Sequence, residues 1–411
     1  MTQDKSYRGV EFHVHPMRLA WQKLRPSQAL STGARSLQFC TRSAPRVDGN
    51  PKWVAIKPLL SGICGSDLSL LRARSSPYLA PLTSWPAVLG HEVVGEIATP
   101  DAPWPLGTRV VIDPSLACEA RGLPLCLACA RGEPDECANR HDSDLGAGML
   151  LGYHRDLPGG WSTTMWAPVK QIFPIPYAMK TRRAVLVEPA AIVLQGLSRV
   201  FRLAADSRVL VLGAGTVGLL TVWLLKETHG TPHISVHARY PHQARMASQL
   251  GAATVYQDNG NAGFVTNSKL RAIVGTPYPT QFNGWPYLPY GFDLIVDTIG
   301  SQTSFYEAAT LVRPGGQILL LGGAGRMSVD FAPIWSRRIT LLGSFGYGHA
   351  AVSDASTTFQ SVINRLHETT LPIENLVTHA IPLNRYEDAF KLLGNHEPTI
   401  KVALSSPTPS V

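Results

Sequence analysis

The pattern of apolar and polar positions divides the chain into two parts with different secondary structure. Up to about Thr181, short apolar runs lie between turns rich in Gly and Pro, as at Trp53–Ile56, Val88–Leu89, Val93–Ile97 and Thr108–Ile112. Such runs are typical of strands. Residues 113–160 then lack apolar periodicity and are rich in turn residues. We therefore expect a β-rich first part that carries one long loop-like excursion.

After Thr181, strand-like and helix-like segments alternate. Strands are expected at 208–212, 233–236, 292–297 and 317–321, and helices at 216–226, 242–250 and 303–311. This βαβ alternation predicts a parallel, doubly wound sheet, so the fold class is α/β. Beyond 345 we expect helices near 354–368 and 385–394 and a last strand at 400–404. Residues 275–291, rich in Pro and aromatic residues, read as an ordered surface insertion.

Length and composition favour a globular protein of two domains. The chain has 411 residues, of which 45% are hydrophobic and 16% charged, which is ample material for two cores. Residues 1–10 contain charges and no apolar run, and no stretch approaches the roughly twenty apolar residues that span a bilayer. We therefore expect a cytoplasmic protein with no membrane partner, in which thiols stay reduced.

The net charge of +8 raises the question of nucleic-acid binding. Lys and Arg are spread along the chain, however, and the only doublets are Arg182–Arg183 and Arg337–Arg338. No basic helix accompanies them, so this charge reads as a solvated surface and no nucleic-acid partner is expected.

Two groups of metal-ligand residues differ in their chemistry. Cys64 lies in G-I-C-G-S-D, and His91 and Glu92 lie in G-H-E. One Cys, one His and nearby carboxylates leave a coordination position open, as in catalytic zinc sites. The second group, with the spacing C-x7-C-x2-C-x7-C, consists of Cys118, Cys126, Cys129 and Cys137. Four thiolates form a closed structural zinc site, whereas disulfides would need an oxidising compartment. The remaining Cys40 is expected to be a buried free thiol.

A glycine motif follows the strand expected at 208–212. Residues 213–218 read G-A-G-T-V-G, namely Gly213, Ala214, Gly215, Thr216, Val217 and Gly218. Between a strand and a helix, such a turn brings a dinucleotide pyrophosphate to the helix N-terminus. About twenty residues later an acid would select NAD. This chain has Ala238 and then Arg239, with His242 and Arg245 close behind, which favours NADP(H) over NAD(H).

In order along the chain, the motifs G-I-C-G-S-D, G-H-E, the four-Cys loop, V-E-P and G-A-G-T-V-G resemble the zinc-dependent medium-chain dehydrogenases and reductases. The likeness is to the alcohol and polyol dehydrogenases, in the branch similar to sorbitol, threonine and glucose dehydrogenases, and it covers roughly residues 50–404. It implies a GroES-like catalytic domain over 1–188, including a structural-zinc loop at 113–140. A Rossmann coenzyme domain over 189–345 and a return to the catalytic domain over 346–411 follow.

The same resemblance implies roles for individual residues. Cys64 and His91 match the catalytic zinc ligands, Glu92 the acid beside the His, and Glu188, in V-E-P, the final ligand position. Ser66 matches the hydroxyl that passes on the substrate proton, and Asp67 the acid that orients the site. Lys401 corresponds to a basic residue that contacts the coenzyme pyrophosphate.

The chain departs from the family pattern in three places. The four-Cys lobe usually reads C-x2-C-x2-C-x7-C, whereas here the first spacing is seven and Leu123 stands where a Cys is expected. Ser69 stands where many members carry a His that relays the proton to solvent. The N-terminal stretch Phe12–Pro51 is also longer than typical, and its sequence assigns it no role.

The function predicted from these observations is zinc-dependent hydride transfer between a secondary alcohol or polyol, or the matching carbonyl compound, and NADP(H) or NAD(H). One alternative is a zinc-free enone or quinone reductase of the same superfold. Another is a non-catalytic nucleotide-binding regulatory protein. We also expect a homodimer or homotetramer, because the apolar strand Ile339–Gly343 closes the coenzyme-domain sheet and would expose a pairing edge.

Overall fold

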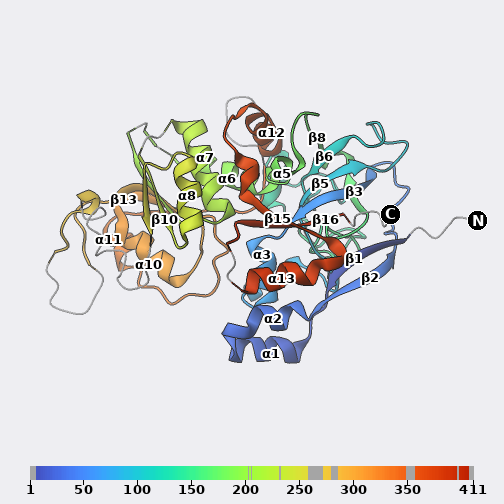
Figure 1. The fold of residues 1–411 in the computed structure, drawn as a ribbon, viewed down its shortest axis with the longest axis horizontal. Coiled ribbons are helices and arrows are strands. Elements are labelled where there is room, and N and C mark those ends of the chain that lie inside the picture. Colours follow the sequence, from blue (N-terminus) through green and yellow to red (C-terminus); the bar gives the residue numbers. More distant parts are fainter. Residues whose placement is uncertain are drawn as a thin grey trace, which may run out of the picture. The chain divides into compact units, whose positions relative to one another are not determined.

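The computed structural model describes residues 6–201, 203–204, 206–230, 233–257, 272–278, 286–348, 357–395 and 398–406. These residues form two compact units, drawn in Figure 1. The first unit consists of the described residues up to Ala191 and from Gly346 onward, and the second of the described residues within Ile192–Phe345. The chain thus begins in the first unit, continues through the second and ends in the first.

The second unit contains a six-stranded sheet in which, over the described residues, all neighbouring strands are parallel. The strand order is β11-β10-β9-β12-β13-β14. Its strands are β9 (Arg208–Leu212), β10 (His233–Ala238), β11 (Thr254–Gln257), β12 (Phe292–Asp297), β13 (Val312–Leu320) and β14 (Thr340–Gly343). The helices beside them are α7 (Thr216–His229), α8 (Pro241–Gln249), α10 (Gln302–Leu311) and α11 (Ala332–Ser336). This order confirms the predicted doubly wound sheet.

The central strands of this sheet are apolar along their length because helices cover their faces. In β9 the residues from Val209 to Leu212 are all fully buried, and Leu294–Val296 of β12 are buried beside them. Phe305 and Ala308 of α10 pack into the same core. Continuous burial explains why the strands read as unbroken apolar runs in the sequence.

The first unit is built on a seven-stranded, mostly antiparallel sheet with the order β15-β16-β3-β5-β6-β8, in which β7 also pairs with β3. Its strands are β3 (Trp53–Gly62), β5 (Glu92–Ile97), β6 (Arg109–Ile112), β7 (Met165–Pro168), β8 (Ile172–Pro174), β15 (Val377–Pro382) and β16 (Lys401–Ser405). The pairing of Ala403 with Gly62 brings the late strand β16 beside β3. The predicted β-rich first part is confirmed.

Helices connect the strands of the first unit. They are α3 (Gly65–Leu71), α4 (Leu127–Ala130), α5 (Thr181–Ala184), α6 (Val187–Ser198), α12 (Thr358–Glu368) and α13 (Tyr386–Gly394). Short 3-10 helices lie at η2 (Pro77–Leu82), η3 (Pro134–Glu136), η4 (Val169–Gln171), η6 (Ile373–Leu376) and η7 (Leu383–Arg385). The helix expected near 354–368 begins in the described residues at Thr358, since 349–356 lie outside them.

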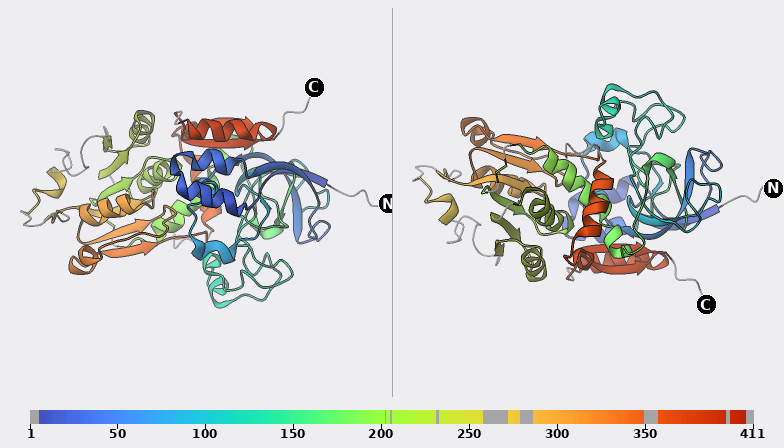
Figure 2. Two further views of the ribbon diagram at one scale, coloured as in Figure 1. Left: turned by 90° about the horizontal axis from the view of Figure 1, so that it is seen from below. Right: turned by 90° about the horizontal axis from the view of Figure 1, so that it is seen from above.

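The long N-terminal stretch forms structure that the sequence pattern did not predict. Strands β1 (Ser6–Phe12) and β2 (Leu37–Ser43) pair with each other and with β4 (Ala87–Val88). Between them lie α1 (Pro16–Leu24), η1 (Pro26–Gln28) and α2 (Ala29–Ala34), which lie side by side in Figures 1 and 2. The buried Gln22 side chain donates to the carbonyls of Ala29, at 2.9 Å, and of Leu71 at the end of α3. The stretch is therefore a helical layer fastened to α3.

Residues 113–150 form a lobe with little regular structure, the teal loops that stand out from the strands in Figure 2. The Pro- and aromatic-rich insertion lies partly outside the described residues, at 279–285. Its described flanks pair, because Tyr278 N–H donates to the Tyr287 carbonyl at 3.0 Å and the two rings stack at 5.2 Å.

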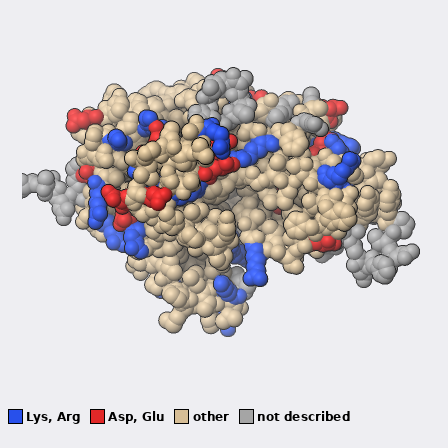
Figure 3. All heavy atoms as spheres, turned by 180° about the vertical axis from the view of Figure 1, so that it is seen from behind, with Lys and Arg blue, Asp and Glu red and all other residues tan. Residues whose placement is uncertain are grey.

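No helix in the described part of the chain is long and apolar enough to cross a membrane. On the face of the molecule drawn in Figure 3, Lys and Arg are interspersed with Asp, Glu and uncharged residues. Cys40, on the edge strand β2, is a free thiol as expected, but it is half-buried and not buried.

Candidate active site and metal centres

The segment G-I-C-G-S-D forms the turn between β3 and α3. Cys64 has an extended backbone and is the N-cap of α3. Its N–H donates to Asp67 Oδ2 at 2.9 Å, so the third helical residue reaches back to the cap. This reciprocal contact is local in sequence, and it fixes both the Cys64 thiol and the Asp67 carboxylate.

Cys64, His91 and Glu92 come together as the sequence predicted. His91 follows β4, Glu92 begins β5, and one ligand atom from each of the three lies within 4.8 Å of the others. Within the described residues, the buried His91 Nδ1 has no hydrogen-bond partner, and it lies 3.8 Å from Asp67 Oδ1. Burial and the Glu92 carboxylate raise the pKa of the Cys64 thiol to about 12. A thiol, an imidazole and a carboxylate at this spacing fit zinc, whose charge would stabilise the thiolate.

Glu92 is also held by a buried lysine. Lys401 Nζ donates to both Glu92 carboxylate oxygens at 2.6 Å and to the Ile63 carbonyl at 3.2 Å. Burial alone would lower the pKa of Lys401, but the Glu92 carboxylate outweighs it and the pKa is raised. The expected contact of Lys401 with the coenzyme pyrophosphate stays a prediction. Its ammonium is buried and bound to a carboxylate of its own unit.

Glu188, near the start of α6, is a third buried carboxylate of this site, beside Asp67 and Glu92. The Tyr347 hydroxyl donates to its Oε1, and both side chains are buried. Burial raises the pKa of Glu188 to about 8, with His91, Glu92 and Cys64 near enough to act on it. Glu188 is thus electrostatically linked to the three clustered residues, although it lies outside their 4.8 Å group.

Ser66 and Asp67 share a partner that the sequence did not indicate. The Tyr153 hydroxyl lies 3.0 Å from Asp67 Oδ1 and 3.2 Å from Ser66 Oγ. Ser66 also hydrogen-bonds the Cys64 side chain. Eighty-seven positions separate Tyr153 from Ser66, so no local motif could have paired them.

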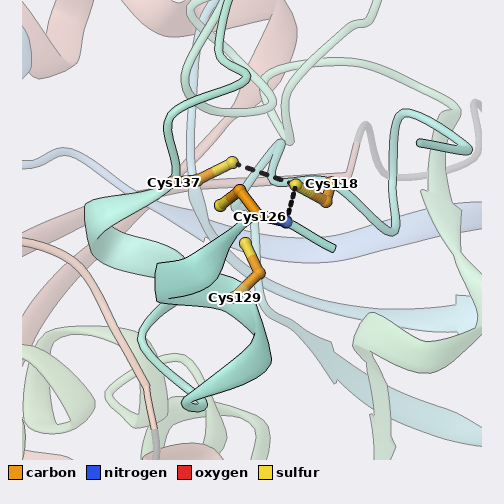
Figure 4. A group of neighbouring side chains, drawn as sticks. All are labelled: Cys118, Cys126, Cys129 and Cys137. Carbon is orange, nitrogen blue, oxygen red and sulfur yellow. Dashed lines mark hydrogen bonds between the residues drawn. The ribbon is translucent and has the colours of Figure 1, made fainter. Parts of the chain in front are cut away.

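The four cysteines of the lobe converge in spite of their altered spacing. Cys118, Cys126, Cys129 and Cys137 place all four sulfurs within 4.8 Å of one another, and none is in a disulfide (Figure 4). Cys118 Sγ lies 3.6 Å from Cys137 Sγ and accepts the Cys126 N–H at 3.4 Å. Backbone hydrogen bonds lower the pKa of Cys126 to about 6, whereas burial raises the pKa of Cys129 and of Cys137. Four such sulfurs fit a structural zinc ion.

The longer first arm reaches the cluster because it turns back on itself. Leu123 N–H donates to the Cys118 carbonyl at 3.0 Å, closing a tight turn after Cys118. The buried Arg121 guanidinium donates to four carbonyls of the lobe, those of Leu116, Asp142, Gly146 and Gly148, at 2.5–2.9 Å. Arg121 therefore holds the lobe together in addition to the four cysteines. The spacing of residues in the sequence could not identify this role.

The glycine motif lies where the sequence placed it, between β9 and α7. Gly213 has a φ of +94°, and a Cβ on Gly218 would lie 2.0 Å from the Gly213 carbonyl oxygen. Gly215 is the N-cap of α7, and Thr216 and Val217 are its first two residues. The turn is therefore tight, and it leaves the N–H groups of a fourteen-residue helix as a pyrophosphate site.

Strand β10 ends at the buried Ala238, and the exposed Arg239 follows. The Arg239 guanidinium lies 5.4 Å from the Tyr240 ring centroid, and that ring stacks on His242 at 5.6 Å. Arg245 is exposed on α8. The end of β10 thus presents a basic, aromatic group of side chains, and none of the described residues 238–245 is an acid.

Comparison with known proteins agrees with this architecture. The family model of the alcohol dehydrogenase GroES-like domain matches residues 50–177, and that of zinc-binding dehydrogenases matches residues 216–367. D-arabinitol dehydrogenase 1 of Uromyces fabae is 26% identical over 380 residues, which cover 90% of this chain and 94% of that protein. Sorbitol dehydrogenase of Arabidopsis thaliana is 24% identical over 361 residues, covering 86% and 88%.

Solved structures share the fold. A short chain alcohol dehydrogenase from Escherichia coli CFT073, complexed with NADH, superposes with a TM-score of 0.73 at 23% identity, covering 97% of this chain and 99% of that one. The two family models together match more than half of the chain. The chain therefore belongs to the zinc-type family of medium-chain dehydrogenases and reductases and is an oxidoreductase.

Proposed function

We propose that the protein catalyses reversible, zinc-dependent hydride transfer between a secondary alcohol or polyol and NADP(H). The observation that carries this proposal is the convergence of Cys64, His91 and Glu92 beside the hydroxyl of Ser66. The relatives named as arabinitol and sorbitol dehydrogenases support a polyol substrate. The neighbour complexed with NADH supports a nicotinamide coenzyme.

Cys64 and His91 would hold the zinc ion, with a carboxylate as the third protein ligand. We assign that role to Glu188, because Lys401 engages both oxygens of Glu92. Bound zinc supplies Lewis-acid polarisation of the alcohol oxygen. Ser66 would relay the proton that the alcohol loses, accepting it while releasing its own hydroxyl proton toward water or the coenzyme ribose, and a bound nicotinamide would supply the hydride acceptor. Asp67 stabilises the turn by accepting a hydrogen bond from the Cys64 N–H.

The structural zinc ion would be bound by Cys118, Cys126, Cys129 and Cys137. The coenzyme pyrophosphate would lie on the turn from Gly213 to Gly218. Arg239, with His242 and Arg245, would bind the 2′-phosphate of NADP, because an acid that would repel a phosphate is missing at the end of β10.

The test is a panel of polyols and secondary alcohols assayed with NADP and with NAD, together with metal analysis. Cys64→Ser and His91→Ala should abolish turnover and remove one zinc ion while the protein stays folded. Cys40→Ser is the matched control, since Cys40 lies on β2, away from both cysteine groups, and should change neither quantity. Full turnover by metal-free protein would contradict the proposal and favour a zinc-free reductase.

A further inference from the structure

Tyr153 is the one side chain that joins the two polar residues of the G-S-D turn. Its hydroxyl lies within hydrogen-bond distance of both Ser66 Oγ and Asp67 Oδ1. The ring is buried, and it packs between Trp85, with ring centroids 5.8 Å apart, and His91, at 5.6 Å. The contacts with Asp67, Trp85 and His91 thus leave the phenol little freedom to turn away from Ser66.

The backbone around Tyr153 is equally constrained. Gly152 has a φ of +87°, and a Cβ there would lie 2.9 Å from the Gly90 carbonyl oxygen. The turn before Tyr153 therefore contacts the residue that precedes His91. Tyr153 N–H donates to the Leu150 carbonyl at 3.1 Å, and its own carbonyl accepts from Ser84 N–H at 3.2 Å. The backbone hydrogen bonds of the Tyr153 N–H and of its carbonyl therefore fix the position from which the ring projects.

The arrangement matters because Ser66 has, besides Tyr153, the Cys64 side chain as a hydrogen-bond partner. Ser66 is exposed at the start of α3, and a serine hydroxyl rotates freely unless a partner fixes it. A tyrosine phenol has an ordinary pKa of about 10, so it keeps its proton at neutral pH. With that proton directed to Asp67, the phenol oxygen can accept from Ser66 and leave a serine lone pair to face a substrate hydroxyl.

We propose that Tyr153 is a positioning residue that orients the Ser66 hydroxyl for proton transfer, at a site where Ser69 replaces the histidine found in many relatives. The inference rests on the proposed function, because it concerns the proton of the same alcohol. Tyr153 acts through Ser66 and does not itself contact the reacting atoms.

The experiment is a double-mutant cycle on polyol oxidation. Tyr153→Phe removes only the hydroxyl, and it should lower kcat about tenfold, the loss expected for one hydrogen bond to a reacting group. The Michaelis constant for the nicotinamide and the zinc content should not change. In a Ser66→Ala background, the same substitution should change kcat by less than about twofold, since its target is gone. Tyr7→Phe is the matched control, because Tyr7 is also buried in this unit and packs on Trp166.

The outcomes separate this inference from the function. Lack of any turnover by the wild-type protein would overturn both. Wild-type turnover with an unchanged kcat in Tyr153→Phe would overturn the inference alone. An equal loss in the two backgrounds, or a variant that loses zinc or does not fold, would show that Tyr153 supports the structure and does not act on Ser66.

Discussion

At the scale of single residues, the site contains three buried acids, each of which accepts a hydrogen bond from a side chain far away in the sequence. Asp67 has Tyr153, Glu188 has Tyr347 and Glu92 has Lys401. A buried carboxylate needs such a partner because leaving it unpaired costs several kcal/mol. The acids were visible in the sequence as parts of motifs. Their donors were not, because each lies far away along the chain.

Lys401→Met should leave Glu92 charged and unpaired in a dry environment. We expect the free energy of unfolding to fall by about 3–5 kcal/mol, the cost of breaking a buried pair. Chemical denaturation of the zinc-loaded protein measures it. The double variant Glu92→Gln, Lys401→Met should recover most of the loss. An unchanged stability in Lys401→Met would mean that Glu92 has found another cation, namely the zinc ion.

Arg239→Ala should raise the Michaelis constant for NADP and leave that for NAD nearly unchanged. A charge-assisted hydrogen bond to phosphate contributes roughly 1.5–3 kcal/mol, which corresponds to about ten- to a hundredfold. Arg208→Ala, at the opposite end of the same sheet, is the control. Equal or better use of NAD by the wild-type protein would refute the NADP preference.

At the scale of elements, the four-Cys lobe should depend on its metal. Residues 113–150 contain little regular structure. A bound zinc ion, together with Arg121, would therefore stabilise the lobe in place of a hydrophobic core. The wild-type chain should contain two zinc ions, and Cys118→Ser should contain one and be cut faster by protease within the lobe. Wild-type protein with a single zinc ion, unchanged in Cys118→Ser, would show that the altered spacing does not support metal.

Glu374 of η6 forms ion pairs that connect η6 to α5. Glu374 accepts from Lys180 at 2.8 Å and from Arg183 Nε at 2.9 Å, and Arg183 also donates to the carbonyls of Leu366 and Thr369. Burial alone would raise the pKa of Glu374, but the hydrogen bonds from Lys180 and Arg183 lower it to about 2. A lowered pKa contributes stability above the usual value of 4.5 that is lost as the pH falls toward 2.

Glu374→Gln should therefore lower stability at neutral pH and flatten its dependence on pH between about 4.5 and 2. Unfolding by urea across that range, compared with Asp101→Asn at an exposed position, measures the difference. If the free energy of unfolding of the wild-type protein did not change with pH over the same range, the ion pairs of Glu374 would contribute nothing to stability.

Prediction from sequence succeeded where periodicity or spacing is local. The strands β9, β10 and β12 are continuous apolar runs, the glycine turn is six consecutive residues, and the four cysteines lie within one segment. It missed α1 and α2, although Met17, Trp21 and Leu24 of α1 follow the i, i+4, i+7 spacing of one apolar helix face. It also missed Tyr153 and Tyr347, whose partners are set by tertiary packing.

At the scale of the whole molecule, we expect a homodimer or homotetramer. Strand β14 is the last in the order of the described parallel sheet, and Leu341 on it is 37% exposed. An apolar edge of this kind pairs readily with another copy. Light scattering at micromolar concentration should show an oligomer, and Leu341→Lys should weaken it. A wild-type monomer under these conditions would contradict the expectation.

The pairing of β16 with β3 has a consequence for how the protein is made. Lys401 and Ile63 are in contact although 338 positions separate them. On the ribosome, β3 emerges long before the strand that completes its sheet and supplies the lysine for Glu92. The interrupting unit, Ile192–Phe345, is contiguous and can fold during that interval. The sheet of the first unit can therefore be completed only after β16 has been synthesised.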